Sequence, residues 1–131
     1  MAQASPFVQE HIVPMLHDKK VTMAQAREEI TTFVQTHYGS LQPYLMTFIY
    51  KYDAYHWYKL FGYDDVLTHR IILDFASMLF ALGIDPERNS AVQRDDFLST
   101  LGIDIQRFTK HNALDDAMIL REAYLALTEK V

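Results

Sequence analysis

Apolar residues recur every three or four positions along most of this chain, which is the spacing of one face of an α-helix. The first such run predicts a helix over residues 7–16, which Pro14 keeps short. A capping box that begins at Thr22 predicts a second helix as far as about His37, with Gly39 after it. The buried stripe of this second helix is expected to consist of Ala26, Ile30, Phe33 and Val34.

Two short apolar runs predict strands. Residues 44–50 are apolar, aromatic and β-branched, which is typical of a strand that is covered on both faces. Residues 71–73 form a second, shorter run. A helix over about 52–61 is predicted between them, and Asp74 is expected to cap a further helix that follows the second strand.

The remainder of the chain is predicted to be helical. A short helix over 94–101 is followed by a loop over 104–110 and by a last helix over 113–128. The predicted order is therefore helix, strand, helix, strand, helix, helix, helix. This is an α/β alternation that is dominated by helices and has too few strands for an ordinary sheet.

Two adjacent aspartates at the start of the last helix have different expected roles. Asn112 is a good N-cap, and Asp115 then occupies the third helical position, where its charge suits the helix N-terminus. Rotation of about 100° per residue places Asp116 on the apolar side instead. A buried carboxylate must be paired, protonated or bound to a metal. His111, just before the helix, could reach the same site.

A third candidate, Asp53, follows the more convincing predicted strand at the start of a helix. Ligand groups gather at that edge of open α/β sheets, although a plain helix-start aspartate is the common alternative. Together with Asp116 and His111, Asp53 suggests a carboxylate metal site with a histidine general base. Mg²⁺ prefers oxygen ligands, and two such ions can activate water and stabilise the leaving oxygen in phosphodiester cleavage.

Possible contacts to a substrate are less specific. Aromatic residues surround Asp53 in sequence, and bases could stack on them, although such a stripe is more often core. His56 is expected to be a partly exposed polar residue. Arg107 and Lys110, in the loop before His111, could meet a phosphate, or they could be solvated loop charges.

Composition narrows the class of protein. The 131 residues fit one domain, with 50% hydrophobic residues for a core. The formal net charge of −5 argues against a protein held on nucleic acid by bulk electrostatics, but not against an enzyme that holds a strand end through metal ions. No cysteine, signal peptide or long apolar window is present, so we expect a cytoplasmic protein that does not cross a membrane.

Several of these segments together resemble one enzyme superfamily. Residues 111–117, followed by 120–123, resemble the last motif of the DEDDh 3′–5′ exonucleases, which are RNase H-like α/β proteins that trim the 3′ ends of RNA or DNA with two divalent ions. Asp53 in its context resembles the middle aspartate of that family, and residues 60–62 resemble a branch of small bacterial exoribonucleases. Further matches in the expected order are residues 7–14 and 97–103, so the resemblance covers roughly residues 6–128.

The resemblance implies roles for the acidic candidates and for His111. Asp53 and Asp116 would be ligands of Mg²⁺ or Mn²⁺, and His111 would be the general base. Asp115 would be a helix-start neighbour, and the substrate would be a single-stranded 3′ end, with RNA favoured. The place of Arg107 and Lys110 in the loop before His111, and not the resemblance, makes them the candidates for contact with this substrate.

One part of the family pattern is missing from this sequence. The first motif, Asp-x-Glu on the first strand, would supply two further ligands. The only Asp-x-Glu here, at residues 85–87, lies in a loop after the middle motif and contains a proline that a central strand would not accept. The sequence therefore predicts a single, incomplete exonuclease-like domain over 1–131 with an N-terminally truncated RNase H-like fold.

Three explanations for the missing motif remain open. The chain could be a natural or mis-started fragment, its missing ligands could come from another chain, or it could be a degenerate relative that binds without catalysis. Each leaves a sheet edge unpaired, so we expect a homo-oligomer or a partner chain that covers it. The expected function is two-metal exonuclease chemistry that is weak or absent in this chain alone. The alternative is a non-catalytic helical interaction or oligomerisation protein derived from the same fold.

Overall fold

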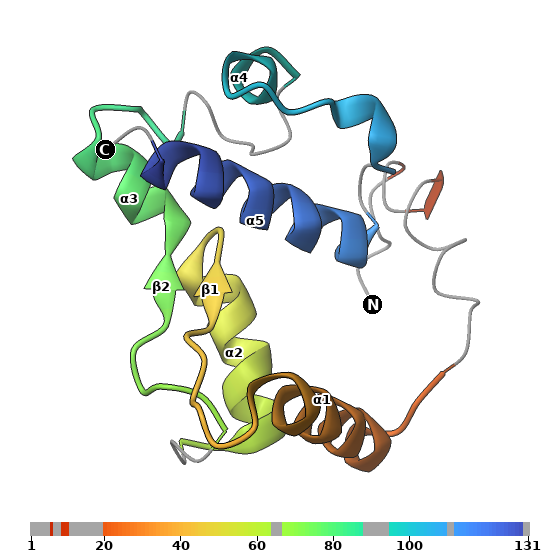
Figure 1. The fold of residues 1–131 in the computed structure, drawn as a ribbon. Coiled ribbons are helices and arrows are strands. Elements are labelled where there is room, and N and C mark those ends of the chain that lie inside the picture. The colour runs from red at the N-terminus through yellow and green to blue at the C-terminus, as the bar shows by residue number, and fades with distance from the viewer. Residues whose placement is uncertain are drawn as a thin grey trace. The chain divides into compact units, whose positions relative to one another are not determined.

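The computed structural model describes residues 6, 9–10, 20–63, 67–87, 95–109 and 112–129 (Figure 1). The chain divides into two compact units, of which one is formed by residues 21–88 and the other by residues 1–20 together with 89–131. Most of the helix predicted over 7–16 lies outside the described residues. The described part is rich in helices and contains one two-stranded parallel sheet, which confirms the prediction of a helix-dominated α/β protein with few strands.

The first helix, α1 (Met23–Tyr38), begins and ends where local sequence signals predicted. Thr22 Oγ1 accepts a hydrogen bond from the Gln25 N–H at 3.2 Å, and Gln25 Oε1 accepts one from the Thr22 N–H at 2.8 Å, which together form the predicted capping box. Gly39 ends the helix with φ +59°, a left-handed conformation that glycine adopts without strain.

The predicted buried stripe of α1 is only partly correct. Val34 is buried, and Ala26 and Ile30 are half-buried, but Phe33 is 57% exposed. The Phe33 ring lies against the His37 ring with the centroids 4.2 Å apart, so it covers its own helix and not the core.

The sheet consists of β1 (Met46–Thr47) and β2 (Leu73–Asp74), which pair in parallel with Met46 opposite Leu73 and Thr47 opposite Asp74 (Figure 1). The Leu73 N–H also donates to the Leu45 carbonyl at 2.8 Å. Strand β1 is shorter than the predicted run at 44–50 and lies within it. Strand β2 overlaps the predicted run at 71–73 only at Leu73 and extends one residue beyond it. Among the described residues β1 pairs with no other strand, so its second edge is unpaired.

A tertiary hydrogen bond explains why the predicted first strand ends early. The next helix, α2 (Tyr50–Phe61), starts two residues before the predicted position. Its N-cap residue, Ile49, has no side chain that could accept a hydrogen bond, but Asp74 Oδ1 accepts one from the Tyr50 N–H at 3.0 Å. A carboxylate at the end of β2 therefore caps α2.

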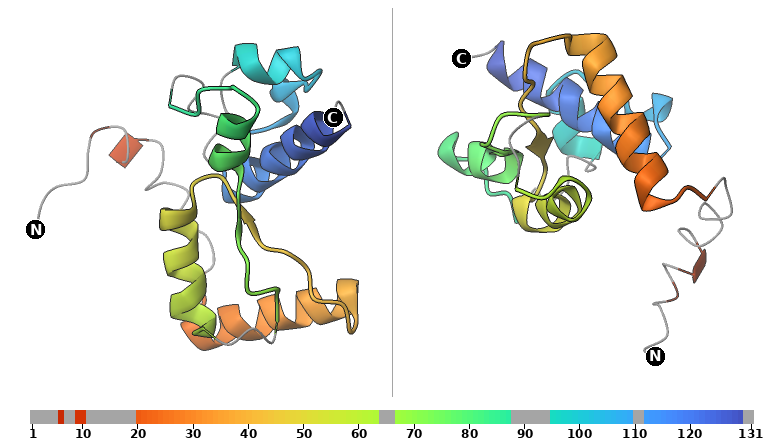
Figure 2. Two further views of the ribbon diagram at one scale, coloured as in Figure 1. Left: turned by 90° about the vertical axis from the view of Figure 1, so that its left-hand side faces the viewer. Right: turned by 90° about the horizontal axis from the view of Figure 1, so that it is seen from below.

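Helices α1 and α2 meet near the C-terminal end of α2 (Figure 2). The Arg27 Nε–H donates to the Leu60 carbonyl at 2.6 Å and so satisfies one of the free carbonyls of the last helical turn. The third helix, α3 (Phe75–Ala81), follows β2 directly, with Asp74 as its N-cap, as predicted. The buried apolar side chains of this unit are Val34, Ala54, Phe75 and Leu79.

The other unit contains α4 (Asp95–Thr100), the 3₁₀ helix η3 (Ile105–Arg107) and α5 (Ala113–Thr128). Helix α5 has the predicted bounds, and α4 lies within the predicted one. The predicted loop over 104–110 contains η3, because Asp104 Oδ1 accepts a hydrogen bond from the Gln106 N–H at 3.1 Å and so caps a short turn. The buried apolar side chains here are Leu98, Ile103, Ile119, Ala123 and Leu127.

Among the described residues, no helix combines the length and the apolar character that a membrane crossing requires.

Candidate functional site

Asp116 lies in the first turn of α5 and faces the buried side of that helix, as its position in the sequence predicted. Its side chain is half-buried, and its Oδ1 atom is fully buried with no hydrogen-bond partner among the described residues. Its backbone N–H is used within the helix, where it donates to the Asn112 carbonyl at 2.8 Å. A buried carboxylate oxygen without a donor is unfavourable by itself, and a cation or a proton would relieve that cost.

The neighbouring carboxylate has a local structural role. Asp115 Oδ2 accepts a hydrogen bond from the Thr109 N–H at 2.7 Å, which holds Thr109 against the first turn of α5. Asn112 Oδ1 caps the helix and accepts from the N–H groups of Leu114 and Asp115 at 3.1 and 3.2 Å. The predicted structural role of Asp115 at the helix start and the inward position of Asp116 are confirmed, and the role of Asp116 as a metal ligand stays a prediction. His111 and Lys110 lie outside the described residues.

Asp53 lies in the first turn of α2, just beyond the end of β1, which is the predicted position. Its side chain is exposed and has no hydrogen bond or ion pair with any described residue. At this place an aspartate also complements the positive end of the helix dipole, so position alone does not separate a ligand from a helix-start residue.

Arg107 has a partner within its own unit. Its Nη2 atom lies 2.7 Å from Glu122 Oε1 of α5, and the two side chains are 57% and 28% exposed. The guanidinium also lies 5.2 Å from the centroid of the Phe108 ring. The sequence pattern predicted a substrate contact for Arg107 and did not foresee the ion pair, because the partner is fifteen residues away.

The only Asp-x-Glu of the sequence lies in a turn, as expected. Asp85 Oδ1 accepts a hydrogen bond from the Glu87 N–H at 3.0 Å, which is a local Asx turn around Pro86. The Asp85 carboxylate is therefore used locally, and neither residue lies on a strand. The pair therefore lacks the strand position that the missing first motif would have.

The predicted metal ligands do not form a complete site within either unit. In the part of the chain that the structure describes, no three histidine, aspartate or glutamate side chains gather closely enough to hold a metal ion. Asp53 and Asp116 belong to different units, and His111 lies outside the described residues. The fit of a divalent ion therefore rests on one local feature, the buried and unpartnered Oδ1 of Asp116. An anionic oxygen is the donor type that Mg²⁺ and Mn²⁺ prefer.

The aromatic residues around Asp53 are more exposed than a core stripe would be. Tyr52 and Tyr55 are 59% and 61% exposed, whereas Trp57 and Phe61 are half-buried and lie against each other with their ring centroids 4.5 Å apart. The aromatic residues of α2 therefore lie on two faces of the helix, with Trp57 and Phe61 on the inner face and Tyr52 and Tyr55 on the outer face. His56 is exposed.

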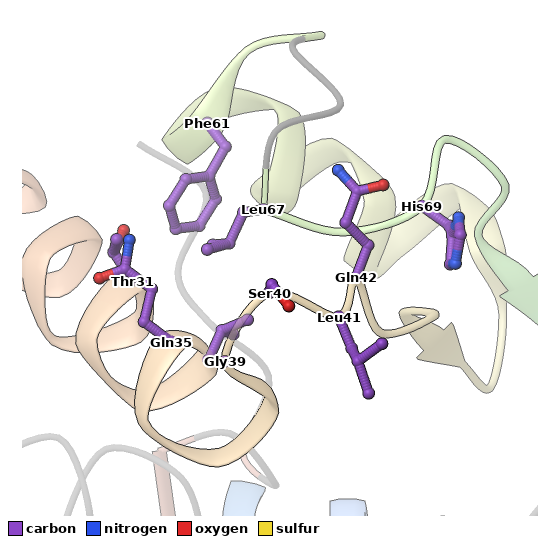
Figure 3. A pocket seen from close by; sticks show the side chains of 10 residues that line it. Thr31, Gln35, Gly39, Ser40, Leu41, Gln42, Phe61, Leu67 and His69 are labelled. Carbon is purple, nitrogen blue, oxygen red and sulfur yellow. The ribbon is translucent and has the colours of Figure 1, made fainter.

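The 21–88 unit also contains a cavity of about 600 Å³ that the sequence did not predict (Figure 3). It lies between α1, the segment after Gly39 and the segment that follows α2. The His69 ring beside it stacks on Tyr44, with the centroids 4.2 Å apart. Of the predicted site residues that the structure describes, none lines this cavity. Its described lining consists of Thr31, Val34, Gln35, Gly39, Ser40, Leu41, Gln42, Phe61, Leu67 and His69.

No protein-family model matches the sequence, and no curated protein or solved structure matches the chain.

Proposed function

We propose that this chain is an RNase H-like, 3′–5′ exonuclease-type protein that acts on single-stranded nucleic acid, with RNA favoured, by metal-dependent hydrolysis of phosphodiester bonds. The observation that carries the proposal is the buried Oδ1 of Asp116, which has no donor among the described residues. It is supported by the ordered motifs around Asp53, His111 and Asp116 in the sequence.

The buried Asp116 carboxylate oxygen is expected to lower the free energy of unfolding of the chain. An unpaired charged oxygen in a buried position destabilises a fold, and a purely structural protein would favour an apolar residue there. The neighbouring aspartate, Asp115, already accepts the hydrogen bond from the Thr109 N–H at the start of the helix, so Asp116 is not required for it. Asp116 therefore has the character of a residue kept for a ligand at the expense of stability.

The candidate residues divide between metal binding, proton transfer and phosphate contact in the proposed reaction. Asp116 and Asp53 would hold divalent ions, Mg²⁺ or Mn²⁺, which when bound activate water and stabilise the leaving oxygen. His111 would accept the proton of the attacking water. Arg107 and Lys110 would contact substrate phosphates, and Arg107 would have to leave Glu122 to do so.

The proposal also requires two carboxylates that the family resemblance assigns to an Asp-x-Glu pair. The pair at residues 85–87 is engaged in its own turn and does not serve. In this proposal a second polypeptide, a copy of this chain or a partner, completes the site, and the chain alone is inactive or weak.

The proposal is tested by incubating the purified chain with 5′-labelled single-stranded RNA and Mn²⁺ at increasing protein concentrations. If copies of this chain complete each other, a ladder that shortens from the 3′ end is expected, with a rate that rises more steeply than linearly with protein concentration. The Asp116→Asn variant should lose the ladder, and the neighbouring Asp115→Asn variant should keep it.

Binding of the metal alone gives a second readout. Mn²⁺ should broaden the NMR signals of residues around Asp116, and Asp116→Asn should abolish this effect. The absence of both the ladder and the broadening at high protein concentration would refute the proposal.

One observation favours the alternative, a non-catalytic oligomerisation protein. Leu114, Met118 and Leu125 are 69%, 43% and 39% exposed and lie on one side of α5, about 180° from the buried side of the helix. A helix that is apolar on two opposite sides usually packs on both of them. In this alternative a second copy of the chain covers the outer stripe.

A further inference from the structure

Helix α2 has an outer face of a distinct chemical character. Its members are all exposed, lie within about 140° of the helix circumference, and are Lys51, Tyr52, Tyr55, His56 and Lys59. We call this set the tyrosine–lysine face. The opposite side of the helix carries the buried Ala54 and the half-buried Trp57 and Phe61, so it accounts for the packing of α2.

Within the face, each tyrosine ring lies near an ammonium group. Lys51 Nζ is 4.8 Å from the centroid of the Tyr52 ring, and Lys59 Nζ is 5.9 Å from the centroid of the Tyr55 ring. Both distances are within the range of cation–π attraction. The rings nevertheless remain more than half exposed, at 59% and 61%, so each still offers an open aromatic surface.

The charge of the face is opposite to that of the chain. The whole sequence has a formal net charge of −5, whereas the tyrosine–lysine face carries two ammonium groups and no carboxylate. The one acidic residue of α2, Asp53, falls outside this arc, about 60° beyond its edge. The positive charge is thus concentrated beside the two exposed rings.

Exposed aromatic rings beside ammonium groups are complementary to a polymer that carries both flat rings and negative charges. Single-stranded nucleic acids present flat base faces, which stack on tyrosine, and phosphates, which lysine neutralises. We propose that the tyrosine–lysine face binds single-stranded nucleic acid, with bases stacked on Tyr52 and Tyr55 and phosphates next to Lys51 and Lys59. The identity of the polymer rests on the proposed function, but the binding itself requires neither a metal nor catalysis.

The dimensions of the face limit what it can hold. Lys51 and Lys59 are eight residues apart, or about 12 Å along the helix axis. Tyr52 and Tyr55 are successive neighbours on that surface. A few nucleotides of one strand would cover the face, and a duplex would not, because its base faces are already stacked on one another.

The test measures fluorescence anisotropy of a short labelled oligonucleotide as the full chain is added without metal, so that cleavage does not interfere. RNA and DNA strands of one sequence, and the corresponding duplex, are compared. The Tyr52→Leu/Tyr55→Leu variant keeps apolar, helix-favouring side chains but removes the rings. Each lost ring is expected to weaken single-strand binding about tenfold.

The charge component is measured with Lys51→Gln/Lys59→Gln. The slope of log affinity against log salt concentration should fall by about 1.4 for the two lost phosphate contacts. The matched controls are Tyr38→Leu and Lys20→Gln, which change exposed residues outside the face and should leave affinity and slope unchanged. Circular dichroism confirms that each variant keeps its helix content.

Three outcomes would overturn this inference: no binding of either single strand by the unaltered chain, equal binding of single strand and duplex, or unchanged affinity in both face variants. The Asp116→Asn variant separates it from the proposed function. Loss of cleavage with binding retained in Asp116→Asn leaves this inference intact, whereas unchanged oligonucleotide affinity in both face variants, with cleavage still lost in Asp116→Asn, refutes the face and not the nuclease.

Discussion

Asp74 Oδ1 accepts a hydrogen bond from the Tyr50 N–H at 3.0 Å, although the two residues are twenty-four positions apart. The other oxygen of the same carboxylate accepts from the N–H of Ser77 at 3.1 Å and from the Ser77 hydroxyl. One side chain thus caps both α2 and α3 and joins the two strand-to-helix connections of the 21–88 unit. The N-terminal end of the helix that carries Asp53 is therefore positioned from β2.

Removing this double cap should destabilise the 21–88 unit. Asp74→Ala is expected to lower the free energy of unfolding by about 2 kcal/mol, because both helices lose an acceptor for their first N–H groups. Urea denaturation followed by circular dichroism measures the change. The matched control is Asp85→Ala, which removes only the local bond to the Glu87 N–H and should cost clearly less. Equal losses in the two variants would contradict the double role.

Thr47 offers a test of an unpartnered hydroxyl. The residue is 3% exposed, and its Oγ1 has no partner among the described residues. Thr47→Val should leave the free energy of unfolding unchanged or raise it by up to about 1 kcal/mol, since a buried polar atom is replaced by a methyl group. Thr47→Ser should lower it by about 1 kcal/mol, since the buried methyl group is lost. The reverse order in thermal melts would show that the hydroxyl has a partner in solution.

Asp116 should reveal a conflict between stability and function. Asp116→Leu is expected to raise the free energy of unfolding by about 1 kcal/mol, because the buried carboxylate oxygen is removed. The same change at Asp115 should lower it, because the Thr109 N–H loses its acceptor. Chemical denaturation in a metal-free buffer measures the free energy of unfolding of the two variants. If Asp116→Leu is the more destabilised of the two, the carboxylate has a structural partner.

The ion pair between Arg107 and Glu122 is expected to contribute little to stability. Because the two side chains are 57% and 28% exposed, solvent screens the pair, and a double-mutant cycle should give a coupling below about 1 kcal/mol. If Arg107 also contacts substrate phosphates, Glu122→Gln should strengthen binding of a single-stranded oligonucleotide and Arg107→Gln should weaken it. The gain from Glu122→Gln should disappear in the Arg107→Gln background. A gain that persists there would mean that Arg107 is not the contact.

The outer apolar stripe of α5 bears on self-association. We expect the chain to form oligomers at micromolar concentration, as the unpaired edge of β1 and the exposed Leu114, Met118 and Leu125 both suggest. Met118→Glu/Leu125→Glu should shift the mass measured by light scattering toward the monomer. Ala117→Glu, also exposed on α5 but beside the stripe, should not. A monomer in the unaltered chain would exclude both the second-copy alternative and a site completed by a second copy.

The predictable part of the fold consists of features whose causes are local in sequence. The Thr22 capping box, the Asn112 cap and the bounds of α5 were predicted correctly, because each depends on hydrogen bonds within four residues or on helical periodicity. The same periodicity placed Asp116 on the inner side of α5 and Asp115 on the outer side. Of the candidate site, this is the part that the sequence could anticipate.

The remaining features depend on contacts between distant segments. The sequence by itself determined the helices, their caps and the inward position of Asp116, since neighbouring residues suffice for these. Only the tertiary structure decided that α2 begins at Tyr50, because the acceptor for that N–H belongs to Asp74 on another strand. It likewise decided that Tyr52 and Tyr55 face outward and that Arg107 meets Glu122. Burial and pairing across the chain are set by which surfaces the fold brings together, and no local pattern contains that information.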